Sequence, residues 1–442
     1  MQEPGRARVL YGVEERPASL WESLLYGWQH TLVDISPFVL PLGLAAALGF
    51  GDLETAQLIS FGLVGMGLAT LMQTTIGNRL PIIQGPSATL TGSIIPVASQ
   101  MGPAAMWGAV FAGGLIEAAL GASRALSLLR RYFPPLVSGV VITVIGLSLA
   151  QLAARLTLGD GSASNFAFAG GVLALILLLQ FGLKGHGILS RGAIFFSIWM
   201  VGLGVGTLTG SVSWDLVAQQ PWFQAPILFP YGFPGGGWEF TLAAVLAVMA
   251  GYLGSIMESV GDYAATCRVA AQRLTSRHIN RGIFSEGLGC AAVSLIGGMP
   301  CTSYTQNIGI IAATGVASRH VVRIAALFLM AYGLCPKFGA LLVAIPRPVL
   351  GGVFLLVCAQ IVISGITLLK DSLQTPAQGL AAGLSLVISL SLPLYASAGP
   401  AAGALQTAPL LFRLTLTNPV VLAVVLAITL NLLLTQDEGA DR

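Results

Sequence analysis

The chain has 442 residues, of which 55% are hydrophobic and only 9% are charged, against roughly 25% charged residues in an ordinary soluble domain. Its 21 basic and 18 acidic residues are too few to solvate the two or three soluble domains that this length would otherwise give. The composition therefore excludes a disordered chain, a nucleic-acid-binding protein and a secreted disulfide scaffold. It favours an all-α polytopic membrane protein, since each transmembrane helix needs about 20 apolar residues.

The apolar segments between glycine, proline and charge clusters predict fourteen spans in two groups of seven. A cytoplasmic segment, 1–23, precedes the first group, and a cytoplasmic tail, 436–442, follows the second. In chain order the predicted spans are 24–49, 54–77, 80–100, 103–122, 134–157, 164–184 and 189–209, then 240–270, 280–298, 300–314, 320–340, 345–367, 374–395 and 417–435. An odd number of spans per half requires the two halves to be inverted repeats, as in many secondary transporters.

Positive charge tests this count. With the N-terminus in the cytoplasm, every basic residue falls in a predicted inner segment except Arg155, Lys337, Arg347 and Arg413. One wrong span would reverse the side of every later loop, so the positive-inside rule supports fourteen spans with both termini cytoplasmic. We expect no cleavable signal peptide, because residues 1–21 are polar, and we expect a bacterial inner membrane location.

The third span of each half is interrupted near its start. Residues 80–89 read LPIIQGPSAT, and residues 299–309 read MPCTSYTQNIG. Segments interrupted by proline and glycine at corresponding positions in two halves point to a transport site near the bilayer midplane, and the helix N-termini after the breaks would offer free N–H donors to a polar solute. The alternative is a pair of loops that dip into the membrane surface.

Five acidic residues fall inside apolar spans, where a charge costs at least about 2.5–3.5 kcal/mol. They are Asp34, Glu117, Glu258, Asp262 and Glu286. Glu258 and Asp262 are four residues apart and share one helix face. Two acids this close in a low dielectric should not both ionise easily, which suits proton uptake and release. The alternative is a polar pair that only packs the bundle.

The other three acids allow less specific predictions. Glu286 either lines the same cavity or pairs with an arginine of the preceding loop, and Glu117 has no identifiable partner. Asp34 follows His30 by four residues on one helix face, which a His–Asp hydrogen bond would explain. Enzymatic catalysis is disfavoured, because the chain has no GxSxG motif and only four histidines. The five cysteines lack metal-site spacing, so we expect neither a metal nor another cofactor.

Residues 306–315, QNIGIIAATG, resemble the signature of the nucleobase–ascorbate transporter family, Q/E/P-N-x-G-x-x-x-x-T-R/K/G. Four further features are similar to the family's, in order along nearly the whole chain. They are the Gln29-His30 pair of span 1, the broken span at 85–88, the acidic motif at 258–263, and an acid at Glu286 where many purine members carry Asp.

The resemblance implies a core domain and a gate domain. Spans 1–4 (24–122) and 8–11 (240–340) would form the core, and spans 5–7 (134–209) and 12–14 (345–435) the gate. The substrate would lie between them, near the crossing of spans 3 and 10. Members of the family are commonly homodimers through the gate domain.

The resemblance also assigns roles to single residues. Glu258 would bind ring N–H groups of a nucleobase, and Gln306 would make the second side-chain contact. The chemistry fits, because a dione ring offers N–H and C=O groups along one edge, and a carboxylate only accepts whereas an amide also donates. Backbone amides near Ser87, Ala88 and Gln306 would contact ring carbonyls.

Supporting roles and substrate preference follow from the same resemblance. His30 would hold span 1 against the core, and Asn307 would brace the site. Gln306 is typical of xanthine and urate members, whereas uracil members carry Glu and ascorbate members carry Pro. Asp262 replaces the His of the uracil group. We therefore predict a symporter for xanthine or urate driven by protons rather than sodium. Uracil, ascorbate, or an anion carried by the same inverted fold are the alternatives.

Overall fold

The computed structural model describes residues 9–33, 39–123, 126, 134–182, 189–190, 192–230, 237–370, 372–398, 403, 405 and 407–435. Asp34, one of the predicted supporting residues, lies outside them.

Helices coincide with all fourteen predicted segments. The first half contains α1 (Leu20–Val33), α2 (Val39–Leu48), α3 (Asp52–Thr75), β1 (Gln84–Pro86), α4 (Ala88–Ser123), α6 (Pro135–Leu158), α7 (Ala163–Leu177), η2 (Leu178–Gly182), α9 (Ala193–Ser197), η3 (Ile198–Val205), α10 (Gly206–Leu208) and α11 (Asp215–Gln219). The second half contains α12 (Leu242–Val269), α13 (Ser276–Leu295), β2 (Cys301–Ser303), α14 (Thr305–Thr314), α15 (Arg319–Gly333), α16 (Pro336–Ala344), α17 (Arg347–Lys370), α18 (Pro376–Ala398), α20 (Leu410–Thr417) and α21 (Pro419–Thr435).

By length and composition, seven of the described helices could each cross a membrane, or nine if each of two sharply bent pairs counts as one span. The bent pairs are α15–α16, at 76°, and α20–α21, at 88°. The first bend corrects the prediction of one continuous span over 320–340. It occurs because Pro336 has no N–H for the preceding turn, whereas proline is favourable in the first turn of a new helix.

Helix α4 contains two of the predicted spans. A straight helix of its 36 residues would be about 54 Å long, almost twice the thickness of a bilayer core. The helix breaks at Gly102, whose φ of 81° lies in the left-handed region that glycine adopts without steric cost. This break lies between the predicted spans 80–100 and 103–122. Fourteen crossings remain a prediction, because several of the predicted spans are short or interrupted helices.

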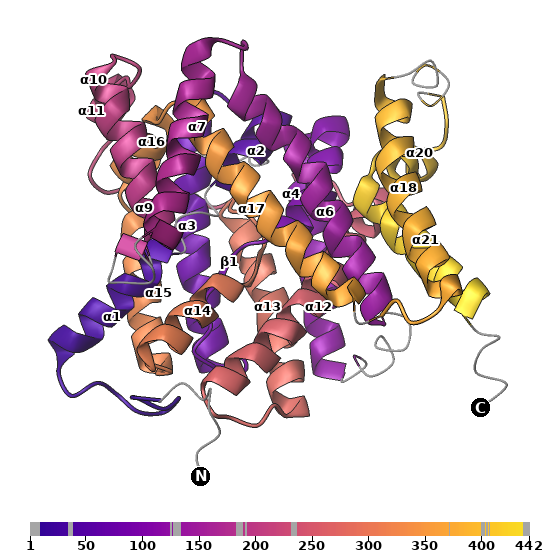
Figure 1. Ribbon diagram of the computed structural model, residues 1–442, viewed down its shortest axis with the longest axis horizontal. Helices are drawn as coiled ribbons and strands as arrows, with labels where there is room; N and C mark the ends of the chain where they lie inside the picture. The colour runs from indigo at the N-terminus through magenta and orange to yellow at the C-terminus, as the bar shows by residue number, and fades with distance from the viewer. Residues whose placement is uncertain are drawn as a thin grey trace.

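Helix packing repeats between the two halves. Helix α3, in the second predicted span of the first half, packs against α15, in the fourth span of the second half; the counterparts α13 and α4 pack in the same way. Helices α6 and α17, the fifth span of each half, make the most extensive contact and run side by side near the centre of Figure 1. This exchange of partners is the pattern that an internal repeat produces.

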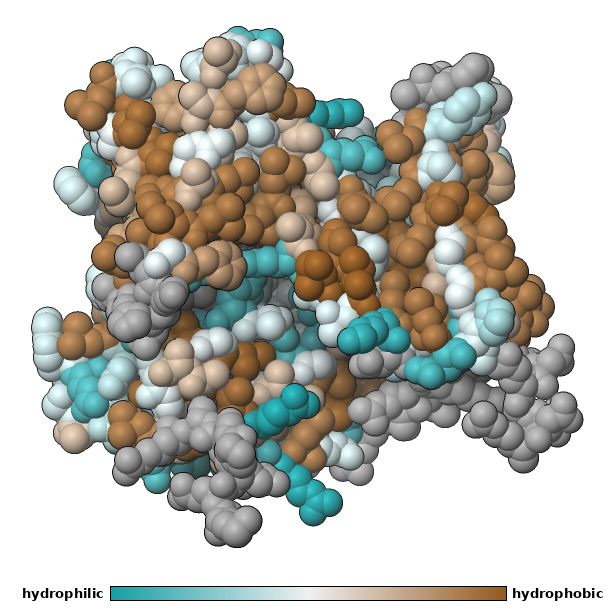
Figure 2. Space-filling view, in the orientation of Figure 1, coloured by the Kyte–Doolittle hydropathy of each residue, from teal (hydrophilic) through white to brown (hydrophobic). Residues whose placement is uncertain are grey.

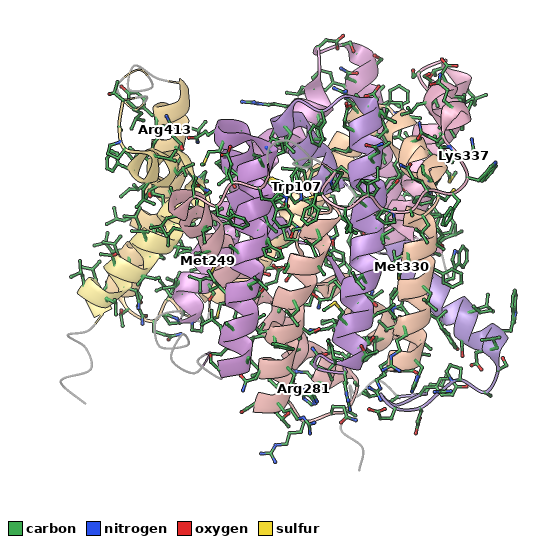
Figure 3. The ribbon with its side chains drawn as sticks, turned by 180° about the vertical axis from the view of Figure 1, so that it is seen from behind. Trp107, Met249, Arg281, Met330, Lys337 and Arg413 are labelled. Atoms are coloured by element: carbon green, nitrogen blue, oxygen red, sulfur yellow. The ribbon has the colours of Figure 1, made fainter. Side chains whose placement is uncertain are left out.

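The surface is apolar around the middle and polar toward the ends. Figure 2 shows hydrophobic side chains over most of the visible face and hydrophilic residues toward its lower edge. Figure 3 places Arg281 at the lower end of the bundle, whereas Lys337 and Arg413 lie toward the opposite end. Arg281 was predicted on one side of the membrane and the other two on the other side. Their separation agrees with the predicted span order.

Candidate functional site

The two interrupted segments meet at the centre of the bundle. Strands β1 and β2 pair antiparallel, with Gln84 opposite Ser303 and Pro86 opposite Cys301. Each strand leads directly into a helix, α4 at Ala88 and α14 at Thr305. Two helix N-termini therefore lie beside one short buried sheet, and the alternative of two loops at the membrane surface does not describe this arrangement.

Ser87 joins the two segments and is fully used in doing so. Its N–H donates to Pro300 O at 2.9 Å, and its Oγ accepts from the N–H of Leu90 at 3.1 Å, which caps the start of α4. The Ser87 amide is therefore not free to meet a ring carbonyl in this conformation, which corrects one part of the sequence prediction. The first N–H groups of a helix have no intrahelical acceptor, so Ala88 is the nearest predicted donor on this helix.

Glu258 lies on α12 beside the start of α4. The hydroxyl of Thr89 donates to Glu258 Oε2 at 2.7 Å, and the side chain is only half-buried. No other described residue hydrogen-bonds to its carboxylate. A carboxylate has about four acceptor sites, so Glu258 keeps acceptor capacity for a solute.

Asp262, one turn further along α12, anchors the opposite broken segment. Its carboxylate accepts from the Ser303 hydroxyl at 3.0 Å and from the Thr305 hydroxyl at 2.8 Å. Asp262 is 5% exposed. The pair predicted on one helix face therefore divides, with Glu258 toward α4 and Asp262 toward the start of α14.

Gln306 follows Thr305 in the first turn of α14. Its side chain is half-buried, and no described residue supplies it with a hydrogen bond. Thr305, which precedes Gln306, and Gly261, three residues after Glu258, are both exposed. Figure 2 shows a hollow with hydrophilic lining at the height of β1 and α14 in Figure 1. Gln306 and Glu258 thus both keep unused polar atoms at the ends of the broken segments.

Glu286, on α13, is 2% exposed and is surrounded by hydroxyl groups. Ser259 donates to both of its oxygens at 2.7 and 2.8 Å, Tyr263 donates to Oε2 at 3.1 Å, and Ser255 and Thr302 donate to Oε1 at 3.1 and 3.3 Å. The sequence left open whether Glu286 pairs with an arginine, and among the described residues it has no arginine partner. Ser259 also accepts a hydrogen bond from the Ser303 hydroxyl at 2.9 Å, so it links Glu286 to strand β2.

This hydroxyl cluster was not predicted from the sequence. Ser255, Ser259 and Tyr263 recur every fourth residue inside an apolar span, and that spacing places them on one helix face. The spacing could have indicated a polar contact with a neighbouring helix. It could not have indicated that the partner was Glu286.

His30 and Asn307 are hydrogen-bonded to each other through Nδ1 and Oδ1. Both side chains are buried, at 1% and 0% exposure. The contact fastens α1 to the first turn of α14. The resemblance implied that His30 holds span 1 against the core and that Asn307 braces the site, and both roles stay predictions.

Glu117 has an unusual environment. It is fully buried in α4, and neither carboxyl oxygen has a partner among the described residues. The helix lies close to α13 here, since a Cβ placed on Gly114 would be 2.7 Å from Gly287 O. Glu117 is therefore near enough to Glu286 to interact with it electrostatically.

Replacing Glu117 by methionine should stabilise the protein. An unsatisfied buried polar group costs about 1–3 kcal/mol, and methionine has a similar volume without it. We expect the melting temperature of the detergent-purified Glu117→Met protein to rise by about 2–4 °C. Glu117→Gln keeps a polar group without a partner and should give no such gain. A lower melting temperature for Glu117→Met would mean that the carboxyl does have a partner in the folded protein.

A cavity of about 710 Å³ lies at the end of the bundle that carries Arg155 and Arg347. Its walls come from α2 and α4 on one side and from α6, α17, α18 and α21 on the other. Gly92 and Pro96 extend its lining along α4, on the helix that begins at Ala88. The cavity reaches neither Glu258 nor Gln306.

Comparison with known proteins identifies the family. A family model described as a permease family matches residues 21–397. The chain is 33% identical over 389 residues to the uric acid permease PucK of Bacillus subtilis, covering 86% of this chain and 88% of PucK. It is 29% identical over 452 residues to the xanthine permease XanQ of Escherichia coli K12, covering 96% and 94%.

A solved structure shares the fold. The transmembrane domain of the cyanobacterial bicarbonate transporter BicA aligns with a TM-score of 0.61 at 15% identity, over 95% of this chain and 99% of that domain. The likeness shows the fold alone, which is the all-α, inverted-repeat fold of membrane transporters. The matched residues 21–397 include all the motifs that carried the resemblance, and the chain belongs to this permease family, the nucleobase–ascorbate transporters.

Proposed function

We propose that this protein takes up a purine, xanthine or urate, together with protons. The observation that carries the proposal is the pair of half-buried side chains, Glu258 and Gln306, which keep unused hydrogen-bonding atoms beside two helix N-termini. PucK is a uric acid permease and XanQ is a xanthine permease. The proposal extends that substrate class to this chain.

The chemistry of the two side chains supports a dione ring. The Glu258 carboxylate accepts from ring N–H groups, and the Gln306 amide accepts from one group and donates to the next. The N–H groups at the start of α4 that lack an intrahelical acceptor, such as that of Ala88, could donate to a ring carbonyl. A ring held in this way would satisfy groups that otherwise remain unpaired, which is how a polar site discriminates against compounds that lack those groups.

We further propose that transport occurs by alternating access between the core and gate domains. The 710 Å³ cavity supports this proposal, because its walls come from both predicted domains, and a space between two rigid parts is where such a motion takes place. We also propose that the protein lies in the inner membrane of a bacterium with both termini in the cytoplasm. We propose that it forms a homodimer through the gate domain.

Uptake into proteoliposomes tests the substrate directly. Labelled xanthine, urate, uracil, ascorbate and bicarbonate should be compared at equal concentration, with an imposed inward proton gradient. We expect xanthine or urate to accumulate most. BicA is a bicarbonate transporter, so bicarbonate represents the anion alternative; a negative Glu258 disfavours it. Accumulation of uracil, ascorbate or bicarbonate without a purine would overturn the proposal.

Gln306→Glu should shift substrate preference from purines toward uracil. A carboxylate cannot donate to a ring carbonyl or nitrogen, and a lost hydrogen bond in a buried site costs about 1–3 kcal/mol. We expect the ratio of xanthine uptake to uracil uptake to fall by at least about tenfold. An unchanged ratio would mean that Gln306 does not contact the substrate. Gln219→Glu, at an exposed position at the end of α11, is the matched control.

A further inference from the structure

A second cavity, of about 410 Å³, lies at the end of the bundle opposite the first. It is lined by residues 12–15 of the N-terminal segment, residues 77–80 between α3 and β1, Gln272, and the first turns of α13. None of the residues assigned to the nucleobase site lines it. Its volume falls within the range of small-molecule sites.

The lining of this cavity concentrates positive charge. It includes Arg79, Arg277 and Arg281, and the last two lie in the first turns of α13, where the helix dipole already disfavours cations. No described carboxylate lies within ion-pair distance of any of the three. Three guanidinium groups at one helix N-terminus favour an anion.

The two acidic residues of the lining are engaged elsewhere. Glu14 forms an ion pair with Arg319, and Glu15 accepts from the Gly12 N–H at 2.8 Å. They shape the N-terminal segment, which pairs through its backbone with residues 315–319. Within the part of the chain that the structure describes, neither forms an ion pair with an arginine of the cavity.

Asn78 supplies an independent indication of a ligand. It lines the cavity, is 4% exposed, and its Oδ1 accepts from the Leu80 N–H at 2.9 Å. Its Nδ2 has no partner among the described residues. Buried donors without partners are uncommon, and Asn78 lines the same cavity as the three arginines.

We propose that this cavity binds a phosphate-bearing anion. Guanidinium groups match phosphate oxygens with paired hydrogen bonds, the α13 N-terminus adds its positive end, and the Asn78 amide gives one further donor. A soluble phosphate compound and the headgroup of an anionic phospholipid share this chemistry. Both are available at the predicted cytoplasmic end, where basic pockets between helices bind anionic headgroups.

The test uses the full-length chain purified in detergent. Inorganic phosphate and AMP are titrated while thermal stability is followed, and bound phosphatidylglycerol is measured by native mass spectrometry. The variants are Arg277→Gln combined with Arg281→Gln, and Asn78→Asp, which keeps the acceptor for Leu80 but replaces the free donor by a negative charge. Arg273→Gln is the matched control, because Arg273 is exposed on the connection between α12 and α13 and does not line the cavity.

We expect both variants to weaken binding by at least about tenfold, since hydrogen bonds to charged groups are among the strongest, while Arg273→Gln binds like the parent. A stability shift with phosphate or AMP identifies a soluble ligand, and retained phosphatidylglycerol identifies a lipid. Should one variant fail to fold, the other still decides. The proposal is overturned if phosphate, AMP and phosphatidylglycerol all fail to bind the parent, or if they bind the folded variants as they bind the control.

Discussion

Glu258→Gln is expected to abolish xanthine uptake while the protein still folds and inserts into the membrane. The carboxylate accepts one hydrogen bond from Thr89 and keeps its remaining lone pairs for the ring N–H groups. The amide presents an N–H₂ group where one of those acceptors was, so a ring N–H meets a donor. Hydrogen bonds to charged groups contribute about 1.5–3 kcal/mol, so substrate affinity should fall by about tenfold to a hundredfold or more.

The measurement is initial uptake of labelled xanthine by proteoliposomes with equal amounts of reconstituted protein. Glu239→Gln removes an exposed carboxylate of the loop before α12 and should transport like the parent. Thr89→Val removes only the hydroxyl that donates to Glu258, and it should cause a smaller loss. Uptake by Glu258→Gln close to that of Glu239→Gln would remove Glu258 from the substrate site.

The broken segments could be predicted from the sequence because their cause is local. The proline and glycine residues at 81, 85, 86 and 300 disfavour a continuous helix, and their equal positions in the two halves pointed to a transport site. The antiparallel pairing of Gln84 with Ser303 is a consequence of tertiary structure. So is the hydrogen bond from the Ser87 N–H to Pro300 O, and for this reason the prediction of a free donor at Ser87 was wrong, whereas the role of the other amides at the helix end stays a prediction.

Contacts between helices could not be predicted in the same way. Helical spacing gives the face on which Glu258, Asp262 and Ser259 lie, but not the neighbour that each face meets. In the structure Glu258 contacts Thr89 of α4, whereas Asp262 contacts Ser303 of β2. Glu286 lies within a cluster of hydroxyl groups that includes Ser259. The unpaired carboxyl of Glu117 likewise depends on the close approach of α4 to α13 at Gly114 and Gly287, which are 173 positions apart in the sequence.

Transport is expected to depend on a proton gradient rather than on sodium, with Asp262 as the coupling residue. Asp262 is buried, and its hydrogen-bond partners among the described residues are the hydroxyls of Ser303 and Thr305. A hydroxyl can donate to a carboxylate or, after rotation, accept from a carboxylic acid, so either protonation state can keep these contacts. Thr305 precedes Gln306 on α14, so Asp262 is hydrogen-bonded to the residue next to the proposed substrate contact.

Asp262→Asn should therefore uncouple accumulation from the gradient while sparing exchange of substrate across the membrane. The asparagine can still hydrogen-bond to both hydroxyls, but it cannot take up or release a proton. We expect accumulation of xanthine above equilibrium to be lost, and exchange of labelled for unlabelled xanthine to stay within about twofold of the parent, a difference of less than 1 kcal/mol. Asp215→Asn, an exposed acid on α11, is the matched control and should accumulate normally.

The assay imposes a pH difference across proteoliposomes, with and without sodium, and follows both accumulation and exchange. Parent protein that accumulates xanthine in response to sodium and ignores pH would show that proton coupling is wrong and that Glu258 is only a substrate ligand. Asp262→Asn protein that accumulates normally would instead move the proton site elsewhere. Glu286 would then be the next residue to substitute, because all its partners are also hydroxyls and it too could change its protonation state without losing them.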